Sequence, residues 1–235
     1  MILKKIAVIS MLLVSFCTSA NDGVWVDATR VIYNENDLSK SLTVNNASEL
    51  RPYLIRSWIE NEKGELNNWV VTPPVYRLKG KGSIQLRLTA IKTEHLSKNE
   101  ESVFYINILA IPGTESEKNN NDDSKISGSM NLAINTKLKV FYRPLSLNDV
   151  NINEEYKRLK FKSDVKGIVI VNPTPFHVNF SELKVGGELV KIGNVMIKPF
   201  SSFTVNTRNN TGAINYTIIN DFGGPIQFNN VNIER

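Results

Sequence analysis

The sequence predicts an all-β protein built from two immunoglobulin-like β-sandwich domains. Short runs with period-two alternation or many β-branched residues recur along the chain, and turn residues separate them. Stretches with the period of an amphipathic helix are almost absent. The runs fall into two sets on either side of Pro144, and each set has the length typical of one immunoglobulin-like domain.

The first set contains about seven candidate strands and ends at Pro144. Its clearest members are VWVDATRVIY, SLTVNN, YLIRSWIE, SIQLRLTAI, SVFYINILAI and MNLAINTKLKVFY. The second set follows the connecting stretch RPLSLNDVNINEEY and contains GIVIVN, FHVNFSEL, FTVNT and AINYTII. We therefore expect one domain at residues 21–144 and another at residues 145–235.

Residues 1–20 have the layout of a cleaved secretory signal peptide. Two lysines precede the apolar run from Ile6 to Phe16, and small residues follow it up to Ala20. That run is too short for a permanent membrane span, and no later segment has the roughly 18 uninterrupted apolar residues that a spanning helix needs. A lipid anchor at Cys17 is the alternative, but such sites require a small residue before the cysteine, where this chain has an aromatic one. The sequence predicts an exported, soluble protein.

Composition argues against several classes of function. The net charge of +5 includes two lysines of residues 1–20, and the remaining charges of both signs are scattered, so no basic face for nucleic acid is expected. The one cysteine lies in the expected signal peptide, so the cores alone must hold the mature fold. Only His95 and His177 are available for metal binding or catalysis, and no nucleophile, phosphate or dinucleotide motif accompanies them. Both histidines are expected at the surface or at a boundary. Although a triad assembled in space stays open as an alternative, we expect no catalytic residue, no metal, no cofactor and no enzymatic activity.

Residues 113–129 interrupt the strand rhythm with a long polar, asparagine-rich loop, and a long apolar stripe follows it. Loops of this length inside one compact domain are uncommon and are often functional. After the loop, alternate side chains of one strand form a continuous apolar series, because successive residues of a strand point to opposite faces. The series is Ile126, Gly128, Met130, Leu132, Ile134, Thr136, Leu138, Val140 and Tyr142. Either its first half packs inside its own domain, or it is offered to another chain.

These features together resemble the periplasmic chaperones of the chaperone–usher pathway, which escort pilus and surface-fibre subunits. The resemblance extends over nearly the whole expected mature chain. The segments that carry it are DATRVIYN (27–34), YLIRSWIEN (53–61), VTPPVYRL (71–78), ESVFYINILAIP (101–112), NTKLKVFYRP (135–144), NPTPFHVNFSEL (172–183) and IINDFGG (218–224).

The resemblance implies a boomerang of two immunoglobulin-like domains that binds pilus or fimbrial subunits by donor-strand complementation. It further implies delivery of these subunits to an outer-membrane usher and a location in the periplasm. Free chaperone is also expected to self-associate through its unprotected apolar stripe. The alternative from another class is a secreted immunoglobulin-like adhesin or fibre subunit. Such a subunit is expected to carry an alternating N-terminal extension before one incomplete domain.

By resemblance, three groups of residues have assigned roles. Arg30 and Lys139 match the cleft cations that anchor the C-terminal carboxylate of the subunit. Surface salt bridges are the alternative role for these two residues. The donor-strand residues are Met130, Leu132 and Ile134, and the alternative is that they belong to the domain's own core.

Glu101, Arg143 and Asp221 match a charged network between the two domains of the resembling chaperones. Such a buried ion network can specify the angle between domains. Lys139 has the opposite parity to the donor residues, so either it reaches the cleft from the other face of the strand or a bulge re-aims it. The long loop without a flanking cysteine pair leaves open whether the client forms a rigid pilus or a thin fibre.

Overall fold

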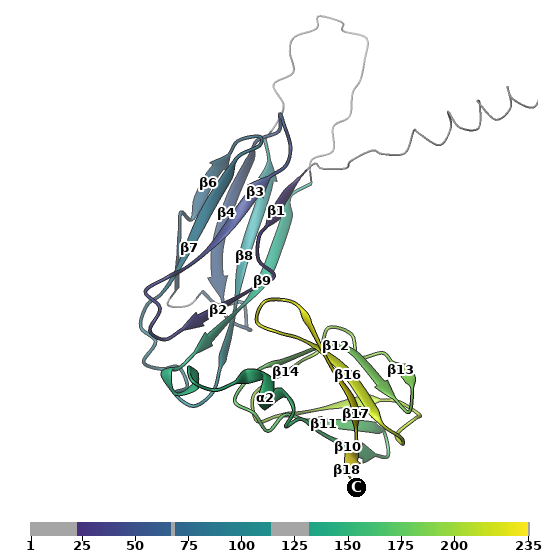
Figure 1. Ribbon diagram of the computed structural model, residues 1–235. Coiled ribbons are helices and arrows are strands. Elements are labelled where there is room, and N and C mark those ends of the chain that lie inside the picture. The colour runs from purple at the N-terminus through teal and green to yellow at the C-terminus, as the bar shows by residue number, and fades with distance from the viewer. Residues whose placement is uncertain (1–22, 67–68, 114–131, 235) are drawn as a thin grey trace, which may run out of the picture.

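The computed structural model describes residues 23–66, 69–113 and 132–234. The expected signal peptide, nearly all of the predicted 113–129 loop, and Met130 lie outside these described residues. Figure 1 shows two all-β domains set at an angle to each other, as the boomerang prediction requires. Within the described residues, no helix has the length and apolar character needed to cross a membrane.

The first domain is a sandwich of two sheets with the strand orders β1-β3-β7-β5 and β2-β9-β8-β4-β6. Apolar side chains from both sheets form a single core between them, with Leu86 and Leu88 fully buried at its centre. The strands are β1 (Val24–Val26), β2 (Arg30–Asn34), β3 (Lys40–Asn46), β4 (Tyr53–Glu60), β5 (Trp69–Thr72), β6 (Val75–Leu78), β7 (Ser83–Ala90), β8 (Ser102–Pro112) and β9 (Ile134–Arg143).

The second domain repeats the two-sheet plan, with the orders β15-β11-β10-β18 and β13-β12-β16-β17, and β14 pairs with β12. Its own core gathers around Phe161, Ile170 and Tyr216. The strands are β10 (Lys160–Asp164), β11 (Gly167–Val171), β12 (Val178–Val185), β13 (Glu188–Val190), β14 (Met196–Ile197), β15 (Ser202–Asn206), β16 (Ile214–Ile219), β17 (Pro225–Val231) and β18 (Ile233–Glu234). The 3-10 helix η1 (Leu145–Leu147) and the short helix α2 (Ile152–Tyr156) connect the domains.

The first predicted strand is divided in two, and this division matters for the site. The sequence pattern predicts one run from Val24 to Tyr33, whereas the chain leaves the first sheet after β1 and joins the second sheet as β2. At the crossover, the Asp27 carboxylate accepts a hydrogen bond from the Thr43 amide at 2.8 Å. β2 therefore reaches β9 only along the second half of that strand, where it pairs in parallel from Lys139 to Arg143.

Candidate functional site

In its second half, strand β9 presents one face to its own core and the other to the second domain. Its register with β8 is uninterrupted from Ser102 opposite Tyr142 to Ala110 opposite Ile134, so no bulge re-aims a side chain in this stretch. Val140 and Tyr142 are buried in the first core. Lys139 lies on the opposite face, from which it reaches the second domain. The parity question is thus answered: the lysine reaches the second domain from the other face of the strand.

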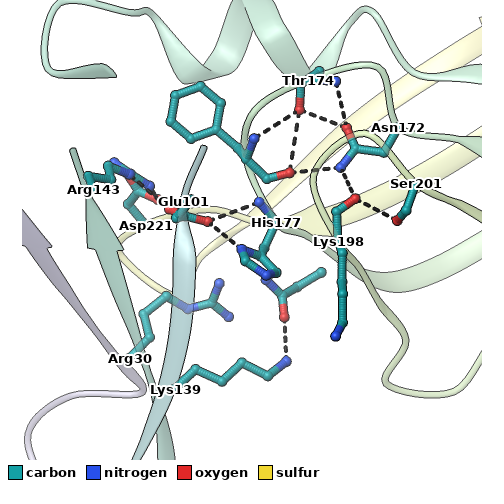
Figure 2. Close-up of polar contacts among 12 residues, drawn as sticks. Arg30, Glu101, Lys139, Arg143, Asn172, Thr174, His177, Lys198, Ser201 and Asp221 are labelled. Atoms are coloured by element: carbon teal, nitrogen blue, oxygen red, sulfur yellow. Dashed lines mark hydrogen bonds and ion pairs between the residues drawn. The ribbon is translucent and has the colours of Figure 1, made fainter. Parts of the chain in front are cut away.

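Arg30 and Lys139 lie directly opposite each other in the parallel β2–β9 pair. Both contact the second domain, since Arg30 Nη1 donates to the Ile219 carbonyl at 3.2 Å and Lys139 Nζ donates to Oδ1 of Asn179. Figure 2 shows the two side chains reaching into the region between the domains. Neither cation has an ion-pair partner among the described residues, so the structure does not give them the alternative role in surface salt bridges.

The electrostatics of this pair favour an anionic ligand. Burial lowers the pKa of Lys139, and the nearby charge of Arg30 lowers it further. Burial also lowers the pKa of the Arg30 guanidinium. Arg30 Nε is buried and has no hydrogen-bond partner among the described residues. Two partly desolvated cations without a bound acid form a site in which a carboxylate would gain charge-assisted hydrogen bonds.

Arg143 joins the two domains through two carboxylates. Its Nε donates to Oε1 of Glu101 at 2.9 Å, while Nη1 and Nη2 donate to the two oxygens of Asp221 at 2.7 and 2.8 Å. The guanidinium also lies over the Phe176 ring, 5.1 Å from its centroid. Although burial alone lowers the pKa of Arg143, hydrogen bonding to Asp221 and the charges of Glu101 and Asp221 raise it overall. The three residues matched to an interdomain network are brought together, with Asp221 supplied by the second domain.

His177 extends this network and was not assigned a role from the sequence. It is buried at the boundary between the domains, where its backbone N–H donates to Glu101 Oε2 at 2.9 Å and its Nδ1 lies 3.0 Å from the same oxygen. The Glu101 amide in turn donates to the Pro175 carbonyl at 2.9 Å. Glu101 is therefore bonded by residues of both domains. For His177, the one signal in the sequence was the NPTPFH segment, which belongs to the family resemblance.

The turn before His177 is held by a small buried polar cluster. Asn172 Nδ2 donates to the carbonyls of Phe176 and Lys198 at 2.7 and 2.8 Å, and Thr174 Oγ1 donates to Asn172 Oδ1 at 2.7 Å. Figure 2 shows this cluster above the Glu101–His177 contact. Because a buried polar group is costly unless it is bonded, these bonds hold the turn in one conformation and fix the position of His177.

The start of β9 and the residues just before it expose apolar side chains beside a free strand edge. Leu132 is 64% exposed and Ile134 is 58% exposed, whereas Leu138 packs against the first core. β8 pairs with this half on one side, but β2 begins to pair with β9 only at Lys139. Within the described residues, the other edge of residues 134–138 is unpaired. Leu132 and Ile134 therefore do not belong to their own domain's core.

Comparisons with known proteins identify the family. The description "Pili and flagellar-assembly chaperone, PapD N-terminal domain" matches residues 23–148, and "Pili assembly chaperone PapD, C-terminal domain" matches residues 154–229. The chain belongs to this family of pilus assembly chaperones.

Individual relatives agree with this family assignment. The chaperone protein FimC of Escherichia coli K12 is 33% identical over 207 residues, which cover 87% of this chain and 82% of FimC. The crystal structure of the periplasmic chaperone SfaE matches with 32% identity and a TM-score of 0.73, covering 89% of this chain and all of the other. A structure of the Salmonella enterica SafA pilin in complex with the SafB chaperone matches with 26% identity and a TM-score of 0.76, covering 88% and 96%.

Proposed function

We propose that this protein is exported to the periplasm, binds pilus or fimbrial subunits by donating β9 to them, and delivers them to an outer-membrane usher. The observation that carries the proposal concerns the described part of the chain, in which the edge of residues 134–138 is unpaired and lies next to two cations without an acidic partner. An exposed strand edge is a template for pairing with another chain. The SafB complex supports the same kind of partner, since it contains a pilin.

In this proposal the donor residues supply what an incomplete subunit lacks. The backbone of residues 134–138 offers unpaired hydrogen-bonding groups, and the exposed side chains of Leu132 and Ile134 fill an apolar groove. Met130, outside the described residues, extends the series by one further alternate position. Burial of each of these side chains contributes about 1.5–3 kcal/mol. Exchange for a better-packed subunit strand then needs no nucleotide.

Arg30 and Lys139 are proposed to anchor the C-terminal carboxylate of the subunit. The anchor would set the register of the added strand, because it fixes the end of the client chain at one rung of the β2–β9 pair. Glu101, Arg143 and Asp221 are proposed to hold the angle between the domains, so that cations from β2 and β9 stay opposite the second domain. No part of this function calls for a catalytic residue or a cofactor.

The same proposal gives the bounds of the signal peptide and of the two domains. Residues 1–20 are the proposed signal peptide, residues 21–144 the subunit-binding domain, and residues 145–235 the second domain. Both family models match this single chain, one in each half. The rival reading as an adhesin or fibre subunit is not favoured, because it expects one incomplete domain and the structure has two sandwiches.

The carboxylate anchor is tested by substituting its two cations. The tagged full-length chain is expressed in its native host, and the periplasmic subunit that purifies with it is identified by mass spectrometry and quantified. Lys139→Ala and Arg30→Ala are each expected to weaken subunit binding roughly 30-fold or more, because they leave a buried carboxylate short of a partner. The matched control is Lys137→Ala, which removes an exposed lysine from the same face of β9. Equal subunit recovery for all four chains would refute the anchor.

Strand donation is tested separately with Leu132→Ser and Ile134→Ser combined. Both side chains are exposed in the free protein, so the variant is expected to fold with unchanged thermal stability but to lose the subunit. Normal subunit recovery by this variant would show that the apolar stripe is not the donated element.

A further inference from the structure

The loop between β16 and β17 runs alongside the cation pair. Asp221 bonds to Arg143, near the end of β9, while Gly223 touches Thr29, the residue just before β2 begins. Between the two strands, Arg143 pairs with Asn34 and Lys139 pairs with Arg30. The loop therefore lies close to the start of β2: Arg30 donates to the Ile219 carbonyl just before the loop, and Gly223 lies beside Thr29 within it. Figure 1 shows this loop of the second domain extending up to the first domain.

The loop is held rigidly. Asn220 Oδ1 accepts hydrogen bonds from the amides of Phe222 and Gly224 at 3.0 and 2.9 Å, and the Asn220 amide donates to the Gly224 carbonyl at 2.9 Å. Gly223 has φ +82°, and a Cβ atom at this position would lie 2.2 Å from Thr29 Oγ1. A side chain at residue 223 would thus push the loop away from β2.

Phe222 is the residue that this rigid loop presents to solvent, and it is 97% exposed. A single exposed apolar residue is common on protein surfaces, so exposure alone does not mark a site. The position of Phe222 does, because its neighbours on both sides in the chain contact the residues around the carboxylate site. The hydrogen bonds of Asn220 hold the backbone on both sides of Phe222, and aromatic side chains are enriched at protein interfaces.

We propose that Phe222 is a client-contact residue, which packs against the last apolar side chain of the strand added to β9. This inference rests on the proposed function. A client strand that pairs with residues 134–138 and ends at Arg30 and Lys139 finishes at the level of Thr29, where the loop tip lies. The second domain thereby selects for an apolar residue at the client's C-terminus, while the cations recognise the carboxylate.

The test uses a defined probe and the full chain. The probe is a fluorescent synthetic peptide of alternating leucine and serine residues that ends in phenylalanine with a free carboxylate, compared with the same peptide as a C-terminal amide. Anisotropy titrations measure binding to the wild type, Phe222→Ala, Phe222→Tyr and Arg30→Ala. Leu189→Ala is the matched control, because Leu189 is also exposed on the second domain but lies on β13.

Phe222→Ala is expected to bind the acid peptide about tenfold more weakly, as loss of an interface anchor does. Phe222→Tyr, which keeps the ring, and Leu189→Ala are expected to bind like the wild type. A 4-fluorophenylalanine placed at residue 222 should change its fluorine chemical shift when the acid peptide is added, which a structural role in the loop would not cause.

Two results overturn the inference in distinguishable ways. If Phe222→Ala binds like the wild type while Arg30→Ala still weakens binding, Phe222 is not a contact and the proposed function stands. If the wild type and Arg30→Ala bind the acid and amide peptides alike, the carboxylate anchor itself fails, and the contact proposed for Phe222 fails with it.

Discussion

The two halves of β9 share one alternating pattern but lie in opposite environments. From Lys139 to Arg143 the strand has neighbours on both edges, its even positions are buried, and its odd positions contact the second domain. From Ile134 to Leu138 one edge is unpaired, and Ile134 is exposed although it continues the apolar series of the buried half. Alternation alone thus says which residues share a face, and the neighbouring strands decide whether that face is a core or a surface.

The charged residues at the odd-numbered positions of β9 also differ in environment between the two halves of the strand. Lys137 is 47% exposed and bonds to Glu60 at 2.6 Å, whereas the Arg143 side chain is only 11% exposed and lies between two carboxylates. Lys139 is half-buried and has no acidic partner among the described residues. An exposed pair, an unpaired cation and a buried network on one strand face should respond very differently to substitution. The following predictions test this contrast, in order of decreasing effect.

The largest effect is expected for Arg143→Ala. The substitution leaves the Glu101 carboxylate buried and without its cation, which destabilises the protein by about 3–5 kcal/mol. Urea denaturation followed by circular dichroism measures the loss. Arg143→Lys is the control, because it keeps the charge but not the paired hydrogen bonds to Asp221, and should lose less. A cost below that of an exposed ion pair would contradict the buried-network description.

Two isoleucines compare the halves directly. Ile106 is fully buried on β8 and pairs with Leu138, whereas Ile134 lies at the start of β9. Ile106→Ala is expected to cost about 2–5 kcal/mol of unfolding free energy. The same change at Ile134 should stay within about 0.5 kcal/mol. If denaturation experiments show that both substitutions lower the unfolding free energy equally, Ile134 is part of the core in solution.

A smaller effect is expected for Glu35, which holds the chain just after β9. Its carboxylate bonds to Lys98 Nζ at 2.5 Å and accepts from the Leu145 amide at 2.9 Å. The bond to Lys98 is the main reason that the pKa of Glu35 is lowered, with the Leu145 bond second. A carboxyl group with a lowered folded-state pKa stabilises the protein above its unfolded pKa of about 4.3, and this stability is lost as the pH falls through the folded value.

Glu35→Gln is therefore expected to lower stability near neutral pH and to match the wild type in strong acid. Denaturation midpoints measured from about pH 7 to pH 2 check this. A gap between the two chains that stays constant across this range would rule out the contribution of the Glu35 charge.

The smallest effect is expected for Lys137→Ala, since this lysine is 47% exposed and solvent reaches its end of the pair with Glu60. Exposed ion pairs contribute about 0–1 kcal/mol and are screened by salt. Denaturation at low and high ionic strength should show a small loss that disappears with added salt. A loss as large as that of Arg143→Ala would erase the distinction between the two ends of the strand face.

Much of the fold could be predicted because strand alternation is local. The two sets of runs and the stripe through Leu132, Ile134 and Val140 were readable from residue spacing, whereas the boundary near Pro144 stays a prediction. Predicting the grouping of Arg30 with Lys139, and of Glu101 with Arg143 and Asp221, required the family resemblance. Arg30 and Lys139 are far apart along the chain, and alternation within one strand does not predict that they lie opposite each other in a strand pair.

Several site residues could not be predicted, because their roles depend on contacts between domains. His177 carries no motif of its own, and its buried position arises from the Asn172 turn on one side and Glu101 on the other. Asn179 and Phe222 look like ordinary strand and loop residues in the sequence. Only the packing of the second domain against β2 and β9 brings Asn179 to Lys139 and the loop that carries Phe222 to Thr29.

The strand pattern, the two-domain plan and the apolar stripe follow from the chemistry of adjacent residues, so they could be predicted from residue spacing. Which half of the stripe remains open depends instead on the packing of distant strands. The chain crosses between sheets after β1, so β2 covers the edge of β9 only from Lys139 onward. Strand pairing and burial depend on residues distant in the sequence. For that reason the strand edge left free among the described residues, and the two cations that have no acidic partner there, appear only when the whole fold is assembled.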